Sequence, residues 1–447
     1  MKSVLVPQLK LSRRGFLKTA AVTGAGLGLT GPGLIGRAEA QQKSVTFAGW
    51  AFEPQVVEAN VKRFMEQNKD LAVKYTPLDL QLYNEKMVAL FNAGTEPDCF
   101  YVRDSNLGAW VEAGWVQPID GLPKLDELNK DTFSFNLDAM RYKGKQYGTP
   151  YYGDIYVYMY DQAALKKANI GNVPITLDQL KSAALEVKKA GITKHPILKG
   201  FKTNVDGLSE FWSMVFASGG KMFNDALDPV FPNEDKTSVE VLEWLVEAMH
   251  SWEILDPKGL ELDETQARDV YLSGQGVFTS NVGNVLPRAN NPEHSKRAGD
   301  IKMMKFPGLK DVGRGPMGWS RLYCIGAKTK AKDEAWRLIY YMGGKDGEGK
   351  YYSAKDWYLK YGVGYAFKSM DSDPEIVAFQ KKSGYDPEIR AQQYGTAKAR
   401  ENIGAPWYND WDRFTQAQIQ NALLRKVKPL EALQASAKKA QELKKAG

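Results

Sequence analysis

Two kinds of hydrophobic pattern alternate along the chain from about residue 44 onward. Short apolar runs at 45–48, 73–75 and 98–102 predict buried β-strands. Between them, at 54–67 and 83–92, apolar residues recur every three or four positions, which predicts amphipathic helices. Because strands that alternate with helices pack as a sheet covered by helices, this part of the chain is predicted to be α/β.

The second half of the chain keeps a few strands but is mostly helical in pattern. Strands are expected at 155–160, 277–279 and 322–325. Helical periodicity is found at 176–189, 207–218, 237–252, 262–272, 333–342, 407–424 and 430–444. In the first of these helices, Thr176 is the predicted N-cap and Gln179 its capping-box partner. A chain of this length is too long for one ordinary core, so two domains or lobes are expected.

The first 40 residues carry a separate pattern. Arg13 and Arg14 stand just before Phe16, a weakly apolar run rich in glycine and alanine follows, and the segment ends in Ala38-Glu39-Ala40. This pattern predicts a twin-arginine export signal over 1–40, cleaved near Ala40, and a mature protein in the bacterial periplasm. A membrane anchor is the competing interpretation, but the glycines interrupt the roughly 20 strongly apolar residues that a spanning helix needs.

The charge of the chain is concentrated in that first segment. Lys and Arg number 60 against 53 Asp and Glu, which gives a formal net charge of +7. Residues 1–40 hold six of the basic residues and one of the acidic residues, so the remainder carries only +2. A nearly balanced surface gives no reason to expect nucleic acid or an anionic membrane as a partner. The 11 Trp and 22 Tyr do suit surfaces that stack on sugar rings.

Residues that could carry catalysis or hold a metal are scarce. His195, His250 and His294 lack the spacing of a metal site, and the chain has no Gly-x-Ser-x-Gly motif and no phosphate-binding loop. Cys99 and Cys324 lie in apolar runs and are expected as buried unpaired thiols, with a disulfide as the alternative. We therefore expect no metal, no cofactor and no enzymatic activity. A secreted glycosidase is the enzymatic alternative, because carboxylates and aromatic residues are plentiful.

Five segments resemble the family 1 extracellular solute-binding proteins, the substrate-binding proteins of sugar-type ABC importers, which include maltose-binding protein. They are KMVALFNAGTEPDCF at 86–100, AGWVQPID at 113–120, YKGKQYGTP at 142–150, YDQAALKK at 160–167 and PLEAL at 429–433. Their order and separation behind an export signal make the resemblance specific, and it covers the chain from about Ser44 to the end. Tyr151, Tyr152 and Asn284 depart from the residues common in this family, which leaves the identity of the ligand open.

The resemblance implies the type II periplasmic-binding-protein fold, in which two discontinuous α/β lobes are joined by three hinge crossings. The N-terminal lobe would comprise 44–152 and 320–363, and the C-terminal lobe 153–319 and 364–447. Ligands of open α/β sheets sit beyond the carboxyl ends of the strands, so the cleft between the lobes is the expected binding site.

Candidate ligand-binding residues lie just after strand ends and near the crossings, where rings can stack on a sugar and planar polar groups can bind its hydroxyls. They are Trp50, Glu53, Arg103, Asp104, Tyr152, Asp154, Trp212, Asn281, Asn284, Trp319, Arg321 and Trp411. The resemblance matches Asp154 and Trp411 to ligand-contacting positions of the family. Structural roles stay open as alternatives: core or helix packing for Trp50, Trp212, Trp319 and Trp411, an ion pair of Arg103 with Asp104, a hinge salt bridge for Asp154, and a structural turn for 279–284.

The function implied by the resemblance is delivery of a carbohydrate to the permease subunits of an ABC importer in the inner membrane. The carbohydrate would be an oligosaccharide, a glycoside or a sugar derivative. The protein is expected to act as a monomer whose lobes close on the ligand, because only the closed form makes both sets of contacts. A polyamine- or iron-binding relative with the same architecture is the alternative to a carbohydrate-binding protein.

Overall fold

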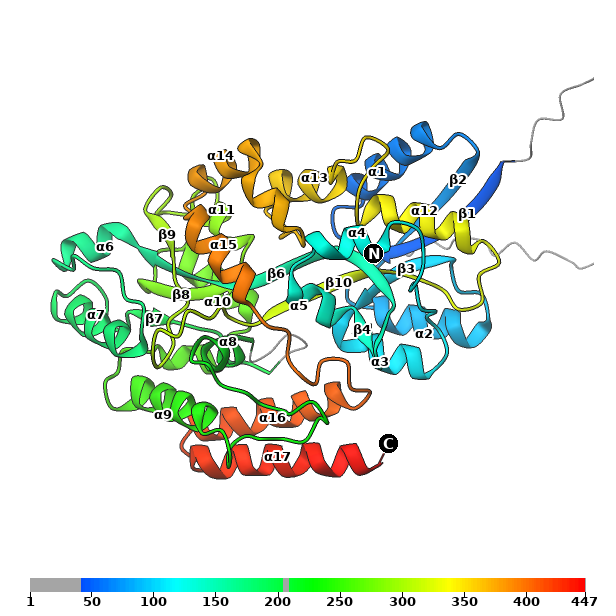
Figure 1. The fold of residues 1–447 in the computed structure, drawn as a ribbon. Helices are drawn as coiled ribbons and strands as arrows, with labels where there is room; N and C mark the ends of the chain where they lie inside the picture. Colours follow the sequence, from blue (N-terminus) through cyan, green and yellow to red (C-terminus); the bar gives the residue numbers. More distant parts are fainter. Residues whose placement is uncertain (1–41, 204–208, 447) are drawn as a thin grey trace, which may run out of the picture. The chain divides into compact units, whose positions relative to one another are not determined.

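The computed structural model describes residues 42–203 and 209–446 (Figure 1). The predicted export signal at 1–40 lies outside these residues, so its route and its cleavage site stay predictions. Among the described helices, none combines the length and the apolar character that crossing a bilayer requires.

One eight-stranded sheet runs through the described chain in the order β2-β1-β3-β10-β6-β8-β7, with β9 paired to β6. Its strands are β1 (Lys43–Trp50), β2 (Leu71–Leu78), β3 (Cys99–Arg103), β6 (Gly148–Asp161), β7 (Ile197–Leu198), β8 (Phe278–Val282), β9 (Ile301–Met304) and β10 (Gly318–Ile325). β2 and β3 both pair with β1 in parallel, whereas β10 is antiparallel to β3 and to β6. A separate hairpin joins β4 (Arg141–Tyr142) to β5 (Lys145–Gln146). The predicted α/β class is therefore confirmed.

Strand β6 connects two regions of the sheet, because its partners change halfway along its length. It pairs with β10 up to Ile155, and from Tyr156 onward it pairs with β8 and β9. Figure 1 shows β6 and β10 passing through the middle of the fold between two groups of helices. The change of partner falls beside the predicted first crossing, although the assignment of 44–152 and 153–319 to separate lobes stays a prediction.

The helices predicted from periodicity are present in the described chain, with ends within a few residues of the expected ones. They are α1 (Pro54–Gln67), α2 (Tyr83–Ala93), α7 (Leu177–Lys189), α8 (Ser209–Ala217), α9 (Thr237–His250), α10 (Glu264–Leu272), α12 (Lys332–Met342), α16 (Tyr408–Leu423) and α17 (Pro429–Ala446). At the start of α7, Thr176 Oγ1 accepts a hydrogen bond from the Gln179 amide, as predicted. The Gln179 side chain instead accepts from the Ile175 amide, so the reciprocal half of the capping box does not form.

The pattern does not mark the short helices individually, although it predicts that the C-terminal third of the chain, which contains the last three of them, is helical. They are α3 (Asp104–Glu112), α4 (Leu125–Asp131), α5 (Ser134–Ala139), α6 (Gln162–Lys167), α11 (Val285–Ala289), α13 (Tyr352–Tyr361), α14 (Pro374–Lys382) and α15 (Pro387–Thr396). Most have too few turns for a 3.6-residue period to stand out. Two of them do carry a start signal, because Asp373 and Asp386 cap helices whose first residue is proline.

Buried apolar side chains form the cores on both sides of the β6 partner change. One core packs helices against β1, β3 and β10 and contains Cys99 and Cys324. Both cysteines are buried free thiols, which confirms that expectation, and burial raises the pKa of each thiol well above its usual value. In another core, α9, α16 and α17 pack against one another, as Figure 1 shows at its lower edge.

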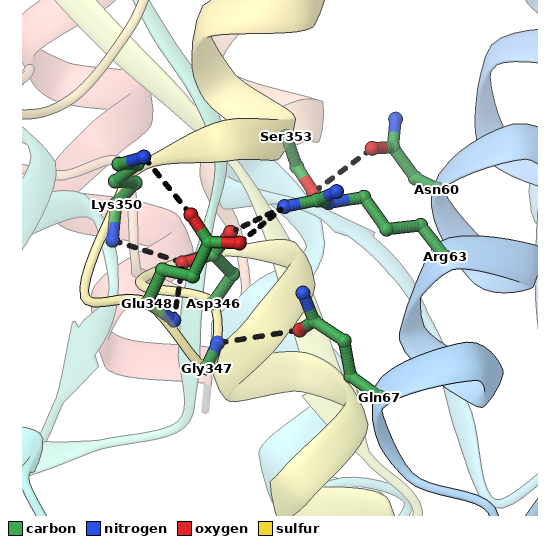
Figure 2. A network of polar contacts seen from close by, with 8 residues as sticks. All are labelled: Asn60, Arg63, Gln67, Asp346, Gly347, Glu348, Lys350 and Ser353. Atoms are coloured by element: carbon green, nitrogen blue, oxygen red, sulfur yellow. Dashed lines mark hydrogen bonds and ion pairs between the residues drawn. The ribbon is translucent and has the colours of Figure 1, made fainter.

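A polar network attaches the loop before α13 to helix α1 (Figure 2). Arg63 Nη2 lies 3.0 Å from Asp346 Oδ2, and Asp346 Oδ1 accepts from the backbone amides of Glu348 and Lys350. Burial raises the pKa of Asp346, but these amide bonds and the guanidinium outweigh burial and hold it below its usual range. The network therefore anchors the start of α13, the helix that leads into residues 362–365.

Glycines allow the segments at the predicted crossings to touch. A Cβ on Gly364 would lie 2.3 Å from the backbone oxygen of Gly153, and one on Gly318 would lie 2.5 Å from the Phe135 ring. The close approach of the third crossing to β6 therefore depends on a missing side chain.

We predict that Gly364→Ala destabilises the protein by about 1–3 kcal/mol, because the added methyl group forces apart two backbone segments. Urea unfolding measures the change. Gly171→Ala is the matched control, because a Cβ there meets no atom within 4 Å. Equal stabilities of the two variants would contradict the close packing of the crossings.

Candidate functional site

Two neighbouring strands build the floor of an inner cavity of about 210 Å³. Tyr152 and Asp154 alternate along β6, and Trp319 and Arg321 alternate along β10, so each pair faces the same side of the sheet. The strands are antiparallel with Trp319 opposite Asp154 and Arg321 opposite Tyr152. Because directly opposite residues share a face, this register brings all four predicted residues together.

The ends of two further strands complete one wall of the inner cavity. Trp50 ends β1 and Arg103 ends β3, and the Arg103 guanidinium lies 5.7 Å from the centre of the Trp50 ring. Asp104, the next residue, points at β10: its Oδ1 lies 2.9 Å from Arg321 Nη1 and its Oδ2 accepts from the Ser320 amide. Asp104 therefore pairs with Arg321, where the sequence suggested a pair with Arg103.

The complete inner cavity contains seven of the twelve predicted residues. Its lining is Trp50, Phe52, Leu80, Arg103, Tyr152, Asp154, Val282, Asn284, Trp319, Arg321 and Val363. Asn284 comes from the loop after β8 and Val363 from the third predicted crossing. The cavity is thus enclosed by parts of the chain on both sides of the β6 partner change.

Asp154 is the most strongly perturbed group in this cavity. Its side chain is buried, and burial raises its pKa from 3.8 to about 6. Hydrogen bonds from Tyr394 Oη at 2.6 Å and from the amides of Ile155 and Gly364 oppose that effect but do not cancel it. These donors hold the carboxylate in one orientation.

Behind Asp154 lies a fully buried cation. The Arg390 guanidinium lies 3.8 Å from the centre of the Tyr394 ring and 4.0 Å from that of Tyr365. It also forms an ion pair of 2.5 Å with Asp371 and donates to Tyr365 Oη. Arg390 lowers the pKa of Asp154 through space, so this cluster both positions Tyr394 and partly stabilises the buried carboxylate.

A smaller side cavity of about 100 Å³ adjoins the inner cavity and shares Tyr152, Val282, Trp319 and Arg321 with it. Tyr156 continues the alternation of β6 into it, and its hydroxyl donates to Glu264 at 2.5 Å. Arg400 also lines this cavity and lies 3.1 Å from Asp412. The cations Arg321 and Arg400 are thus each paired with a carboxylate.

Four predicted residues are not brought into the inner or side cavity. Trp212 and Trp411 are fully buried in the helical core, with ring centres 5.5 Å apart, and Trp411 Nε1 donates to Ser436 O. Trp212 and Trp411 therefore pack in the core, which is the alternative that the sequence left open for them. Asn281 is buried and donates to the backbone of Glu264, so it holds the start of α10. Glu53 borders an outer cavity.

Sequence reasoning missed several residues of the two cavities. Phe52, Leu80, Val282 and Val363 are apolar residues in loops and at strand ends, and Glu264, Ser209 and Arg400 come from distant parts of the chain. The alternation along β6 could have predicted Tyr156, because it is the next residue on the same face as Tyr152 and Asp154. Asp263 is the N-cap of α10 and predicts where this helix begins. It does not predict that the next residue, Glu264, lies beside β6.

The arrangement is suited to binding a polar molecule. Within the described residues, no three His, Cys, Asp or Glu side chains are grouped as metal ligands. Aromatic rings, planar amides and paired charges around a small enclosed space recognise a polar molecule by stacking and hydrogen bonding.

Comparison with known proteins bears on the family and on the fold. The profile of the bacterial extracellular solute-binding proteins matches residues 59–378. The solved structure of maltose-bound MalE3 from T. maritima superposes with a TM-score of 0.73 at 18% identity, covering 90% of this chain and 99% of that one. A ribitol-bound solute-binding protein from Agrobacterium radiobacter K84 gives 0.72 at 18% identity, with coverage of 90% and 99%. The maltotriose-binding protein of Pyrococcus abyssi (strain GE5 / Orsay) is 25% identical over 297 residues, 64% of this chain and 59% of its own length.

The fold is therefore that of the two-lobed periplasmic binding proteins, as predicted. The chain belongs to the bacterial extracellular solute-binding protein family.

The buried carboxylate gives a pH-dependent prediction. Because the folded protein raises the pKa of Asp154 to about 6, it binds this proton more tightly than the unfolded chain, and ionisation reduces stability as the pH rises through that value. Asp154→Asn removes the ionisation but keeps an acceptor for Tyr394. The stability of this variant relative to the wild type should rise by about 2 kcal/mol between pH ~4.5 and ~7.5. Urea unfolding at both pH values measures it, and a pH-independent difference would contradict the assignment.

The buried tryptophans give a second prediction. Trp411→Phe removes a buried hydrogen bond and part of the core, so it should destabilise the protein by about 1–3 kcal/mol. Because Trp411 lines neither cavity, affinity for any ligand should stay within about twofold. Chemical unfolding and calorimetric titration measure the two effects. A large loss of affinity at unchanged stability would restore Trp411 as a ligand contact.

Proposed function

We propose that this protein is the carbohydrate-binding component of an ABC importer and that the inner and side cavities hold the ligand. The observation that carries the proposal is the joint placement of Trp50, Trp319 and Tyr152 around Asp154 and Asn284. Rings of this kind pack against the apolar face of a sugar, and the carboxylate and amide bind its hydroxyls. The maltose, ribitol and maltotriose named for similar proteins support the same ligand class.

Apart from Arg103, whose guanidinium lies 5.7 Å from the centre of the Trp50 ring, the charged side chains discussed above are paired or hydrogen-bonded, which supports an uncharged polyhydroxy group in this position. Arg321 is neutralised by Asp104 and Arg400 by Asp412, while Asp154 and Glu264 are held by tyrosine hydroxyls. The two volumes, 210 and 100 Å³, lie together at the lower end of the range typical of ligand pockets. One sugar ring or one acyclic polyol is the unit that this space suits.

Delivery of the ligand depends on closure of the two lobes. We assign the lobes to 44–152 with 320–363 and to 153–319 with 364–447, and the ligand contacts both. Because only the closed form makes both sets of contacts, binding favours closure, and the closed surface is what the permease subunits in the inner membrane recognise. The protein acts as a monomer in the periplasm, after twin-arginine export and cleavage near Ala40, and it leaves the ligand chemically unchanged.

The test is a thermal-shift screen with maltose, maltotriose, mannitol and ribitol, followed by calorimetric titration and small-angle scattering. At a concentration of 100 times Kd, a true ligand adds about 2.7 kcal/mol of stability and raises the Tm. Binding should also reduce the radius of gyration, and chromatography should recover the sugar unchanged. Turnover of the sugar would contradict the proposal in favour of an enzyme.

Trp319→Ala should lower the affinity about tenfold or more, because it removes a ring that lines both cavities. The matched control is Trp252→Ala: its ring lies 3.8 Å from Lys181 Nζ and lines neither cavity. Equal affinities of the two variants would place the ligand elsewhere.

A further inference from the structure

An outer cavity of about 750 Å³ adjoins the inner cavity, and we call it the vestibule. Phe52 and Asn284 line both spaces, so the vestibule continues directly from the place proposed for the sugar. One side is formed by Glu53 and the end of α13, and the other by α11 and α14. A ligand longer than one ring would extend into it.

The vestibule differs from the inner cavity in its charge. Its lining holds the cations Arg268, Arg288, Lys360 and Lys382 against one carboxylate, Glu53. Two of the cations have nearby partners outside the lining: Arg268 pairs with Asp269 at 2.9 Å and Lys360 with Asp356 at 2.8 Å.

Arg288 and Lys382 carry the excess charge. Both side chains are exposed, and neither has a carboxylate within ion-pair distance among the described residues. They lie on α11 and α14, two helices that meet the same cavity from different parts of the chain. In the inner and side cavities, by contrast, Arg321 pairs with Asp104 and Arg400 pairs with Asp412.

The vestibule also offers surfaces that suit a second sugar unit. Phe52, Tyr361 and Phe379 supply aromatic faces, and the amide of Asn291 supplies hydrogen bonds. Two cations near such rings suit a carboxylate, sulfate or phosphate group carried by that unit, because charged partners form the stronger hydrogen bonds.

We infer that the natural ligand is an acidic carbohydrate whose neutral ring occupies the inner cavity and whose anionic unit occupies the vestibule between Arg288 and Lys382. The inference rests on the proposed function and narrows its ligand class. An anion free of any sugar would lack the inner-cavity contacts and would bind weakly.

The test compares matched compounds that differ by one carboxylate: maltitol with maltobionate, ribitol with ribonate, and glucose with glucuronate. The full-length mature protein is titrated by calorimetry with each member at low and at high salt. We expect the acidic member of at least one pair to bind about tenfold tighter than its neutral partner. Salt should reduce that advantage, because exposed charges are screened.

The variant Arg288→Glu/Lys382→Glu reverses both charges at exposed positions, so the fold should be retained. It should lose the preference for the acid by about tenfold and keep the affinity for the neutral partner within about twofold. The matched control is Lys381→Glu, which reverses the charge of the exposed neighbour of Lys382 outside the vestibule lining. This control should retain the preference.

The outcomes separate this inference from the proposed function. If neutral sugars bind as tightly as their acids, or if the preference survives in the double variant, the inference is overturned and the proposed function stands. If no member of any pair, and no sugar of the earlier screen, binds to the protein, the proposed function itself is overturned, and the inference with it.

Discussion

The buried carboxylate of Asp154 is the constraint on which the binding region depends. It lies where β6, the third predicted crossing and the loop after β8 come together, and a Cβ on Gly364 or Gly283 would lie within 3 Å of its atoms. Its oxygens accept from the amides of Ile155 and Gly364 and from the Tyr394 hydroxyl. One side chain thus joins β6 to the third predicted crossing and to Tyr394 of α15, and it also faces the cavity. Any relative movement of those segments must rearrange its hydrogen bonds.

The burial of Asp154 lowers the stability of the fold at neutral pH, whereas the proposed function needs a carboxylate at this position. Burial raises the pKa of Asp154, so at neutral pH the folded state holds an anion that water would solvate better. The structure limits that cost with directed donors and with the buried Arg390 behind Tyr394. An apolar residue would leave the Tyr394 hydroxyl and the Gly364 amide without an acceptor, and under the proposed function it would also leave ligand hydroxyls without one. The conflict is typical of binding sites, where orientation matters more than the contribution to folding.

Charge is arranged differently in the inner and outer parts of the binding region. Inside, Asp104 takes up both the Arg321 guanidinium and the Ser320 amide, so a potentially anion-binding arginine becomes a rigid part of the wall. Outside, Arg288 and Lys382 are exposed to water, so folding does not desolvate their charges. Under the proposals made above, shape and hydrogen bonds select the neutral part of the ligand, and long-range charge attracts its anionic part.

The sequence by itself determined the α/β class, the strands β1, β2, β3 and β10, and the long helices, because apolar periodicity is a local property that burial preserves. It also placed Trp50, Arg103, Tyr152, Asp154, Asn284, Trp319 and Arg321 at one cavity, because strand ends and chain crossings converge in this kind of sheet. Only the tertiary structure decided that Trp212 and Trp411 pack in the helical core. The local sequence around a tryptophan on a helix is the same whether its ring packs in the core or contacts a ligand. The tertiary structure alone also brought Glu264 and Arg400 to the side cavity and gathered Arg288 with Lys382, because contacts between distant segments depend on how the helices pack and leave no periodic signal in the chain.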